Sequence, residues 1–290
     1  MIRIPDQMRR CVAFLMVSPS GREADVRPVG TAFWVEATRG ADEGVQVRYL
    51  VTARHVVEGA RASGLEDLWL RVDTLAGGAE FLRIPHDDWL VSDSSDYADD
   101  VAVLELTLND RYEYSCCPFR LLGSDAMVEE AAVDAGDPVW MPGLFATHYG
   151  KERNRPIVRW GSVAAMRDEP VPTRLGDLDA YLIEVRSIGG LSGSPVFVSL
   201  DPEGSDLFKA RMSDERGRIG LLLLGLVHGH FDTRPHPSTE AMTLERMNMG
   251  IAIVVPTERI LQILGRPDVE TRRKQQLTRH ASHYRVDGTA

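Results

Sequence analysis

Short runs rich in β-branched and other apolar residues recur along the chain, separated by clusters of glycine, proline, aspartate and serine. The runs are Val12–Val17, Gly30–Val35, Val47–Thr52, Leu68–Val72, Val101–Leu106, Val139–Met141, Ile157–Val163, Tyr181–Val185, Val196–Val198, Leu221–Val227 and Gly250–Val254. Many short strands with turn residues between them are typical of an all-β sandwich or a pair of β-barrels. This pattern constrains the fold more than any other feature, and it predicts an all-β protein.

Helical signals are few. We expect a helical turn after His55 and a helix over Pro256–Leu264, where proline at the start and Gly265 after the end follow the usual asymmetry of helix termini. The stretch Leu108–Asp137 lacks sustained alternation and contains turn residues, which suits a connection between two β units. We predict an N-terminal β unit over residues 1–122, a C-terminal β unit over 123–265, and a polar, basic tail over 266–290. We favour a solvated or disordered tail over a docking helix.

The charge balance argues against two classes of partner. The formal net charge is −10, so no global basic field exists to bind nucleic acid or an anionic membrane. The longest apolar run near the start, Cys11–Val17, is too short to cross a bilayer and has no small-residue cleavage site after it. We therefore expect a cytoplasmic protein without nucleic-acid or membrane partners.

Cysteine usage agrees with that expectation. The chain has three cysteines, Cys11, Cys116 and Cys117, and the last two are adjacent and poorly placed to form a disulfide with each other. No CxxC pair or cluster of cysteine and histidine indicates a zinc site. We expect three packing thiols, no metal and no cofactor.

Three segments carry candidate chemistry. An apolar run ends in His55, and a strand end is a rigid mount for a base. Asp100 lies just before another apolar run, where a carboxylate becomes partly buried. Ser192 is enclosed by Gly190 and Gly193 and precedes the start of a strand. Glycines at such positions permit backbone conformations and close approaches that a β-carbon forbids.

These residue types suit nucleophilic catalysis. A serine hydroxyl is a weak nucleophile and must lose its proton to a neighbouring base as it attacks. We assign that base to His55, and we assign to Asp100 the role of fixing the imidazole tautomer and stabilising the imidazolium. The backbone N–H groups of Gly190 and Ser192 are the expected oxyanion hole. The segments therefore predict a catalytic triad of His55, Asp100 and Ser192.

Acidic residues near Asp100 leave two alternatives open. Asp99 competes for the triad position, but Asp100 directly precedes the apolar run, and we favour it. Asp93, Asp96 and Asp99 form either a calcium-binding loop or a solvated acidic turn. We favour the solvated turn.

Three motifs, in this order, resemble the trypsin-like serine peptidases: Thr52-Ala53-Arg54-His55, Asp100-Val101-Ala102-Val103-Leu104 and Gly190-Leu191-Ser192-Gly193-Ser194-Pro195-Val196-Phe197. The order histidine, aspartate, serine differs from the orders in α/β-hydrolases and subtilisins. The resemblance implies a chymotrypsin-like fold of two six-stranded antiparallel β-barrels, with the active site in the cleft between them and a short C-terminal helix. It also implies a serine endopeptidase that forms an acyl-enzyme on Ser192. The bacterial high-temperature-requirement proteases and glutamyl endopeptidases are the most similar types.

Two residues depart from the family pattern. Leu191 stands where digestive relatives carry an aspartate that captures a newly cut N-terminus, and Arg54 stands where a small residue usually precedes the histidine. We expect protein or peptide substrates and, in the absence of a visible propeptide, a regulatory protein partner. The alternatives are a catalytically impaired module that binds a peptide or protein partner, and an esterase that uses the same groups.

The resemblance also implies a pocket for the residue before the scissile bond. Arg186 and Ser187 are expected on one side of this pocket, with His228 and His230 on the opposite wall. Glutamyl endopeptidases bind a carboxylate there with a histidine and serines, which implies a preference for an acidic residue. The alternative is an outward Arg186 and a small aliphatic pocket.

Overall fold

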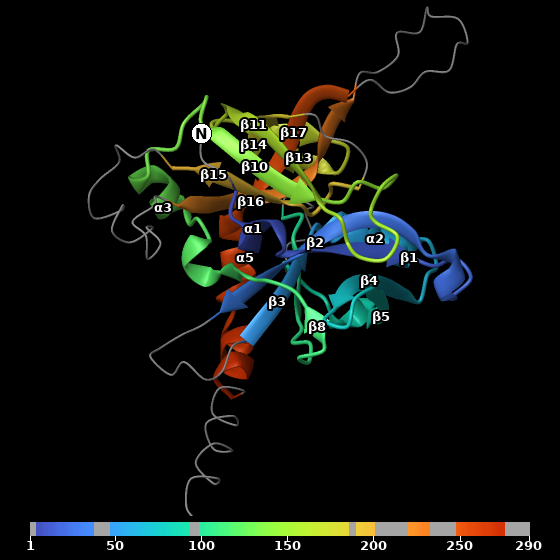
Figure 1. Cartoon of the computed structure of the whole chain (residues 1–290). Helices are drawn as coiled ribbons and strands as arrows, with labels where there is room; N and C mark the ends of the chain where they lie inside the picture. The colour runs from blue at the N-terminus through green and yellow to red at the C-terminus, as the bar shows by residue number, and fades with distance from the viewer. Residues whose placement is uncertain are drawn as a thin grey trace, which may run out of the picture.

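The computed structural model describes residues 4–37, 47–92, 99–185, 190–200, 220–232 and 248–275. Strands dominate the described residues and form two large sheets with a few short helices (Figure 1). One large sheet comes from the N-terminal half of the chain and the other from the C-terminal half. The predicted all-β class is confirmed.

The N-terminal half forms a nine-stranded sheet whose main path is β5-β4-β1-β2-β3-β7-β6, with β8 paired to β4 and β9 to β2. The strands are β1 (Val12–Val17), β2 (Arg27–Ala37), β3 (Val47–Thr52), β4 (Asp67–Thr74), β5 (Ala79–Pro85), β6 (Leu90–Val91), β7 (Ala102–Glu105), β8 (Tyr112–Glu113) and β9 (Cys117–Pro118). Strands β3 and β7 are antiparallel, with Thr52 opposite Ala102. This register places the residues after β3 beside those before β7.

The C-terminal half forms a closed six-stranded barrel in the order β10-β11-β14-β17-β16-β15. Its strands are β10 (Pro138–Gly143), β11 (Ile157–Ala165), β14 (Tyr181–Glu184), β15 (Pro195–Ser199), β16 (Leu221–Asp232) and β17 (Asn248–Pro256). A separate hairpin joins β12 (Val171–Thr173) to β13 (Gly176–Leu178). The C-terminal barrel has the predicted six strands. The N-terminal sheet has seven strands along its main path and two short strands, β8 and β9, paired to it, so it differs from the predicted six.

The helices are short and lie mostly near the chain ends and connections. They are α1 (Asp6–Arg9), α2 (Arg54–Ala62), α3 (Asp125–Glu130) and α5 (Thr257–Leu264). Pro256 and Gly265 occupy the caps of α5, as the sequence predicts. The tail was expected to be solvated, but residues 267–275 are helical and Val269 is fully buried. Within the described ranges, no helix is long and apolar enough to span a membrane.

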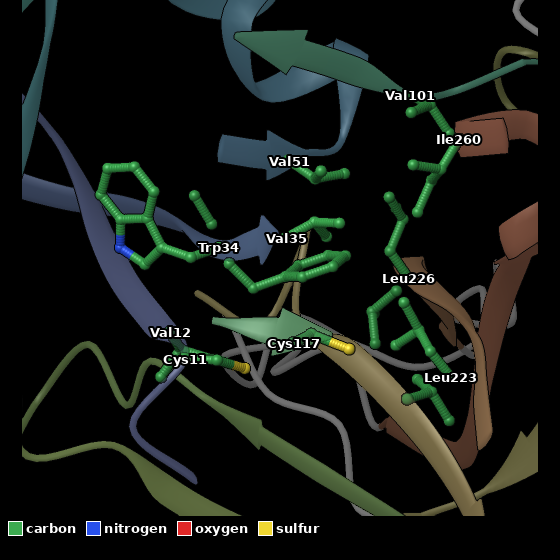
Figure 2. Close-up of a cluster of buried hydrophobic side chains, with 14 of the residues drawn as sticks. Cys11, Val12, Trp34, Val35, Val51, Val101, Cys117, Leu223, Leu226 and Ile260 are labelled. Carbon is green, nitrogen blue, oxygen red and sulfur yellow. The ribbon is translucent and has the colours of Figure 1, made fainter. Parts of the chain in front are cut away.

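A continuous apolar core joins the two sheets. Figure 2 shows Val51 of β3 and Val101 beside β7 near Leu223 and Leu226 of β16, with Ile260 of α5 next to them. All five side chains are fully buried. Removing apolar surface from water stabilises such contacts by about 25 cal/mol per Å². The shared core therefore holds residues of the two sheets in a fixed relation.

The structure also contains elements that the sequence patterns did not predict. Strand β5 is half-buried along most of its length, so it lacks a regular alternation of buried and exposed side chains. Helix α2 has nine residues where only a turn was expected. Its buried residues, Val56, Val57 and Ala60, are spaced to form one helical face.

Cysteine reactivity tests this core. Cys11, Cys116 and Cys117 are free and buried, and burial raises the pKa of the Cys116 thiol to about 12. We expect no alkylation by iodoacetamide in the native state at pH 8, because the thiolate is the reactive form, and full alkylation in guanidinium chloride. Mass spectrometry counts the alkylated thiols. Stoichiometric labelling of the native protein would contradict the burial.

Candidate active site

His55 is mounted at the junction of β3 and α2. Strand β3 ends at Thr52, Ala53 keeps an extended backbone, and α2 begins at Arg54. The histidine therefore lies in the first turn of a helix and not at the strand end that the sequence predicted. Its backbone N–H donates a hydrogen bond of 2.7 Å to Asp100 Oδ1. First-turn N–H groups lack partners within their helix, so the carboxylate caps α2 favourably.

Asp100 lies two residues before β7, and the register of β3 and β7 brings it beside His55. The residue is fully buried. Its Oδ2 is 2.7 Å from Nδ1 of His55 and 2.5 Å from Nδ1 of His228. The carboxylate thus contacts the histidine that the sequence paired with it, and also a second imidazole.

The sequence did not predict the contact between His228 and Asp100. His228 lies on β16 of the C-terminal barrel, and its ring meets the ring of His55 in an edge arrangement with centroids 5.1 Å apart. The family resemblance assigned His228 to the substrate pocket, whereas its Nδ1 faces Asp100. No local pattern signals this contact, because the two residues are 128 positions apart in the chain.

The surroundings of Asp100 favour its ionised form. Burial by itself raises the pKa of a carboxyl group, but hydrogen bonds from His228 and His55 outweigh it and bring the pKa of Asp100 below its usual value. With Oδ2 unprotonated, each Nδ1 must carry the hydrogen. Nε2 of the neutral His55 ring is then unprotonated, as a general base requires.

Ser192 lies in a tight turn between the two sheets. Gly190 and Gly193 have φ angles of 97° and 83°, in the region that favours glycine. The Ser192 carbonyl accepts a hydrogen bond of 2.9 Å from the N–H of Thr31 on β2. The N–H of Gly193 donates one of 2.7 Å to the carbonyl of Val227 on β16. The turn is therefore bonded to both sheets.

The Ser192 hydroxyl donates a hydrogen bond of 3.1 Å to the backbone carbonyl of His228. Within the part of the chain that the structure describes, it makes no hydrogen bond to His55. His55 and Asp100 are thus paired directly. Ser192 is connected to them through His228, whose carbonyl accepts the Ser192 hydroxyl and whose ring contacts Asp100. Rotation about one single bond redirects the hydroxyl, and catalytic hydrogen bonds often form only with substrate.

The backbone N–H groups of Gly190 and Ser192 have no acceptor among the described residues. A buried hydroxyl shapes this turn: Thr31 Oγ1 donates to the Gly190 carbonyl at 2.9 Å and accepts from the N–H of Leu144 at 2.8 Å. Thr31 is fully buried, so both bonds are shielded from water. Two unpaired N–H groups near a nucleophile are what an oxyanion hole requires.

Asp99, the competing candidate, faces other partners. Its carboxylate accepts a hydrogen bond of 2.7 Å from Ser92 Oγ and lies 3.1 Å from Nε of Arg259. The alternative of a calcium loop depends on Asp93 and Asp96, which lie outside the described residues. Of the two neighbouring aspartates, Asp100 is the one that contacts the imidazole.

The two departures from the family pattern have local explanations. Arg54 pairs with Glu58 one turn further along α2, with 2.6 Å between Nε and Oε1. The Arg54 side chain is 13% exposed and that of Glu58 is 31% exposed. Leu191 is buried, and its packing occupies the position where digestive relatives place the activating aspartate.

The predicted substrate pocket is only partly described. Arg186 and Ser187 lie outside the described residues. His230 lies on β16, two residues after His228, and is half-buried. The preference for an acidic residue before the scissile bond therefore stays a prediction.

His55, Asp100 and His228 are also the one group of metal-ligand residues in the described ranges whose donor atoms all lie within 4.8 Å of one another. Separations of 2.5 and 2.7 Å between nitrogen and oxygen are those of charge-assisted hydrogen bonds. Hydrogen bonds account for this geometry, and the three residues form a hydrogen-bond network.

The architecture consists of a closed six-stranded barrel and a second β-sheet packed on it. A histidine, an aspartate and a serine lie at the junction of the two sheets. The chain has a chymotrypsin-like fold. His55 and Asp100 lie beside β3 and β7 of the N-terminal sheet, and Ser192 lies just before β15 of the C-terminal barrel.

Comparison with known proteins gives matches to solved structures only. No family model and no curated protein matches the chain. Deg5 matches with 14% identity and a TM-score of 0.47, over 89% of this chain and 88% of Deg5. The MamO protease domain from Magnetospirillum magneticum matches with 16% identity and a TM-score of 0.46, over 88% and 96%. Human heparin binding protein matches with 12% identity and a TM-score of 0.47, over 92% and 96%.

Substitution of Gly193 tests how tightly the serine turn is held. A β-carbon there would lie inside van der Waals contact of the Thr31 carbonyl and of Thr52 Oγ1, at a positive φ. We expect Gly193→Ala to lower the free energy of unfolding by about 2–4 kcal/mol. Urea denaturation followed by circular dichroism measures the change.

Gly59→Ala is the matched control, because a β-carbon at Gly59 in α2 meets no atom within 4 Å. We expect it to be neutral or to stabilise by about 0.5–1 kcal/mol. Equal stability of Gly193→Ala and the unchanged protein would contradict the close packing of the turn.

Proposed function

We propose that the protein is a serine endopeptidase that hydrolyses peptide bonds of protein substrates through an acyl-enzyme on Ser192. The observation that carries the proposal is the fully buried carboxylate of Asp100 on Nδ1 of His55, which leaves Nε2 free to take a proton. The His55 side chain is 28% exposed, so a substrate can approach it. Two unpaired N–H groups at the serine turn complete the set of groups that acyl transfer needs.

The chemistry follows from these positions. The Ser192 hydroxyl turns from the His228 carbonyl to Nε2 of His55, gives up its proton and attacks the carbonyl carbon of the substrate. Asp100 stabilises the imidazolium, and the N–H groups of Gly190 and Ser192 stabilise the oxyanion. The amine leaves with the proton from His55. Water, deprotonated by the same imidazole, then releases the acyl group and restores the serine, without a cofactor.

Removal of the reacting groups tests the proposal. We expect Ser192→Ala and His55→Ala each to lower hydrolysis of fluorescein-labelled casein by about 10³-fold or more, with the double variant scarcely worse, because the residues act as a unit. Ser63→Ala, an exposed serine after α2, is the control and should keep full activity. Labelling by a fluorophosphonate probe reports an activated serine without a known substrate. Labelling of Ser192→Ala at the unchanged rate would contradict the assignment.

Thr31 tests the oxyanion turn. Thr31→Val keeps the shape of the side chain but removes both hydrogen bonds of its hydroxyl, whereas Thr31→Ser keeps them. We expect fluorophosphonate labelling to slow by about 10- to 100-fold in the valine variant and by less than about threefold in the serine variant. Equal rates in the two variants would show that the hydroxyl does not position Gly190.

A second candidate function is a peptidase-fold module that binds a peptide or protein without cleaving it. The observation that favours it is the hydrogen bond from the Ser192 hydroxyl to the His228 carbonyl, which leaves the hydroxyl unpaired with His55. The same labelling experiment separates the two candidates. A binding module stays unlabelled between pH 6 and pH 9, whereas a peptidase is labelled at Ser192. A regulatory protein partner stays a prediction under either function.

A further inference from the structure

His228 touches two members of the proposed triad at once. Its side-chain Nδ1 donates to Asp100 Oδ2 at 2.5 Å, and its backbone carbonyl accepts the Ser192 hydroxyl at 3.1 Å. One residue of β16 therefore contacts both the carboxylate behind the base and the nucleophile.

The contact with Asp100 is shielded from water. The Asp100 side chain is 0% exposed and that of His228 is 11% exposed. A buried carboxylate is tolerated only when N–H groups surround it, and Asp100 accepts from the backbone and ring of His55 and from the ring of His228. Without His228, Oδ2 would keep a single partner, and the orientation of the carboxylate would depend on His55 alone.

We propose that His228 is a positioning residue of the active site: a second imidazole donor that keeps the carboxylate of Asp100 directed at His55, while its carbonyl holds the Ser192 hydroxyl between turnovers. The proposal rests on the peptidase function proposed above. It assigns the side chain of His228 to the triad and not to the substrate pocket.

The nature of the contact determines which substitution preserves it. The Nδ2 of asparagine lies the same number of bonds from the backbone as Nδ1 of histidine, so His228→Asn can keep the donor to Oδ2. His228→Leu fills a similar volume without a donor. If His228 served only as packing, His228→Leu would preserve the site better than His228→Asn.

The first experiment compares rates of fluorophosphonate labelling at neutral pH in the full chain. We expect His228→Leu to be labelled about 10- to 100-fold more slowly than the unchanged protein, and His228→Asn to stay within about threefold. His148→Asn, an exposed histidine outside this network, is the matched control and should be labelled at the unchanged rate. If folded His228→Leu is labelled at the same rate as the unchanged protein, the proposal is overturned.

The second experiment does not depend on activity. With ¹⁵N-labelled histidine, we expect two strongly downfield-shifted imidazole N–H proton signals in the unchanged protein, because two Nδ1–H groups share one buried carboxylate. His228→Asn should lose one of them and keep the other. This measurement also serves if His228→Leu fails to fold.

The two experiments distinguish failure of this proposal from failure of the proposed function. Labelling at Ser192 with only one downfield signal would overturn the role of His228 and leave the peptidase function standing. Two signals without any labelling would overturn the peptidase function, and the positioning role of His228 would fall with it.

Discussion

Asp100 carries a fully buried carboxylate, and a charge in that position is stable only when hydrogen-bond donors surround it. The structure supplies them from three places: the first turn of α2, the ring of His55 and the ring of His228. Each donor depends on a different feature of the fold, namely the start of α2, the register of β3 and β7, and the packing of β16 on the N-terminal sheet. The buried carboxylate therefore has all three of its donors only when both halves of the molecule are assembled.

The same dependence extends to the nucleophile. Ser192 belongs to the C-terminal barrel, but its carbonyl is bonded to Thr31 of the N-terminal sheet. Gly193 packs against the Thr31 carbonyl and Thr52 Oγ1. A β-carbon at this position would lie too close to both oxygen atoms. The apolar core that joins the sheets stabilises their association, and these polar contacts at its edge fix the position of Ser192 relative to His55. Contacts from both sheets hold the side chains of this site in fixed positions, and separation of the sheets would remove those contacts.

The contact between Asp100 and His55 determines which nitrogen of the His55 ring carries the hydrogen. The depressed pKa of Asp100 keeps the carboxylate ionised and so fixes the hydrogen on Nδ1 of His55. Under the proposed function, His55 therefore has the tautomer of a general base before substrate binds, while the Ser192 hydroxyl remains on the His228 carbonyl. The step that remains is a rotation of the Ser192 side chain, which is small and fast compared with rearrangement of a sheet.

The sequence by itself determined the all-β class, the positions of most core strands, the C-terminal helix and the pairing of His55 with Asp100. These follow from local signals: apolar runs bounded by turn residues, proline and glycine at helix ends, and motifs in a characteristic order. Only the tertiary structure showed that His55 lies in the first turn of a helix capped by Asp100, that the N-terminal sheet has nine strands, and that His228 shares the same carboxylate. The physical reason is that local patterns encode backbone conformation and the buried face of each strand. A hydrogen bond between residues 128 positions apart depends on how two complete sheets pack.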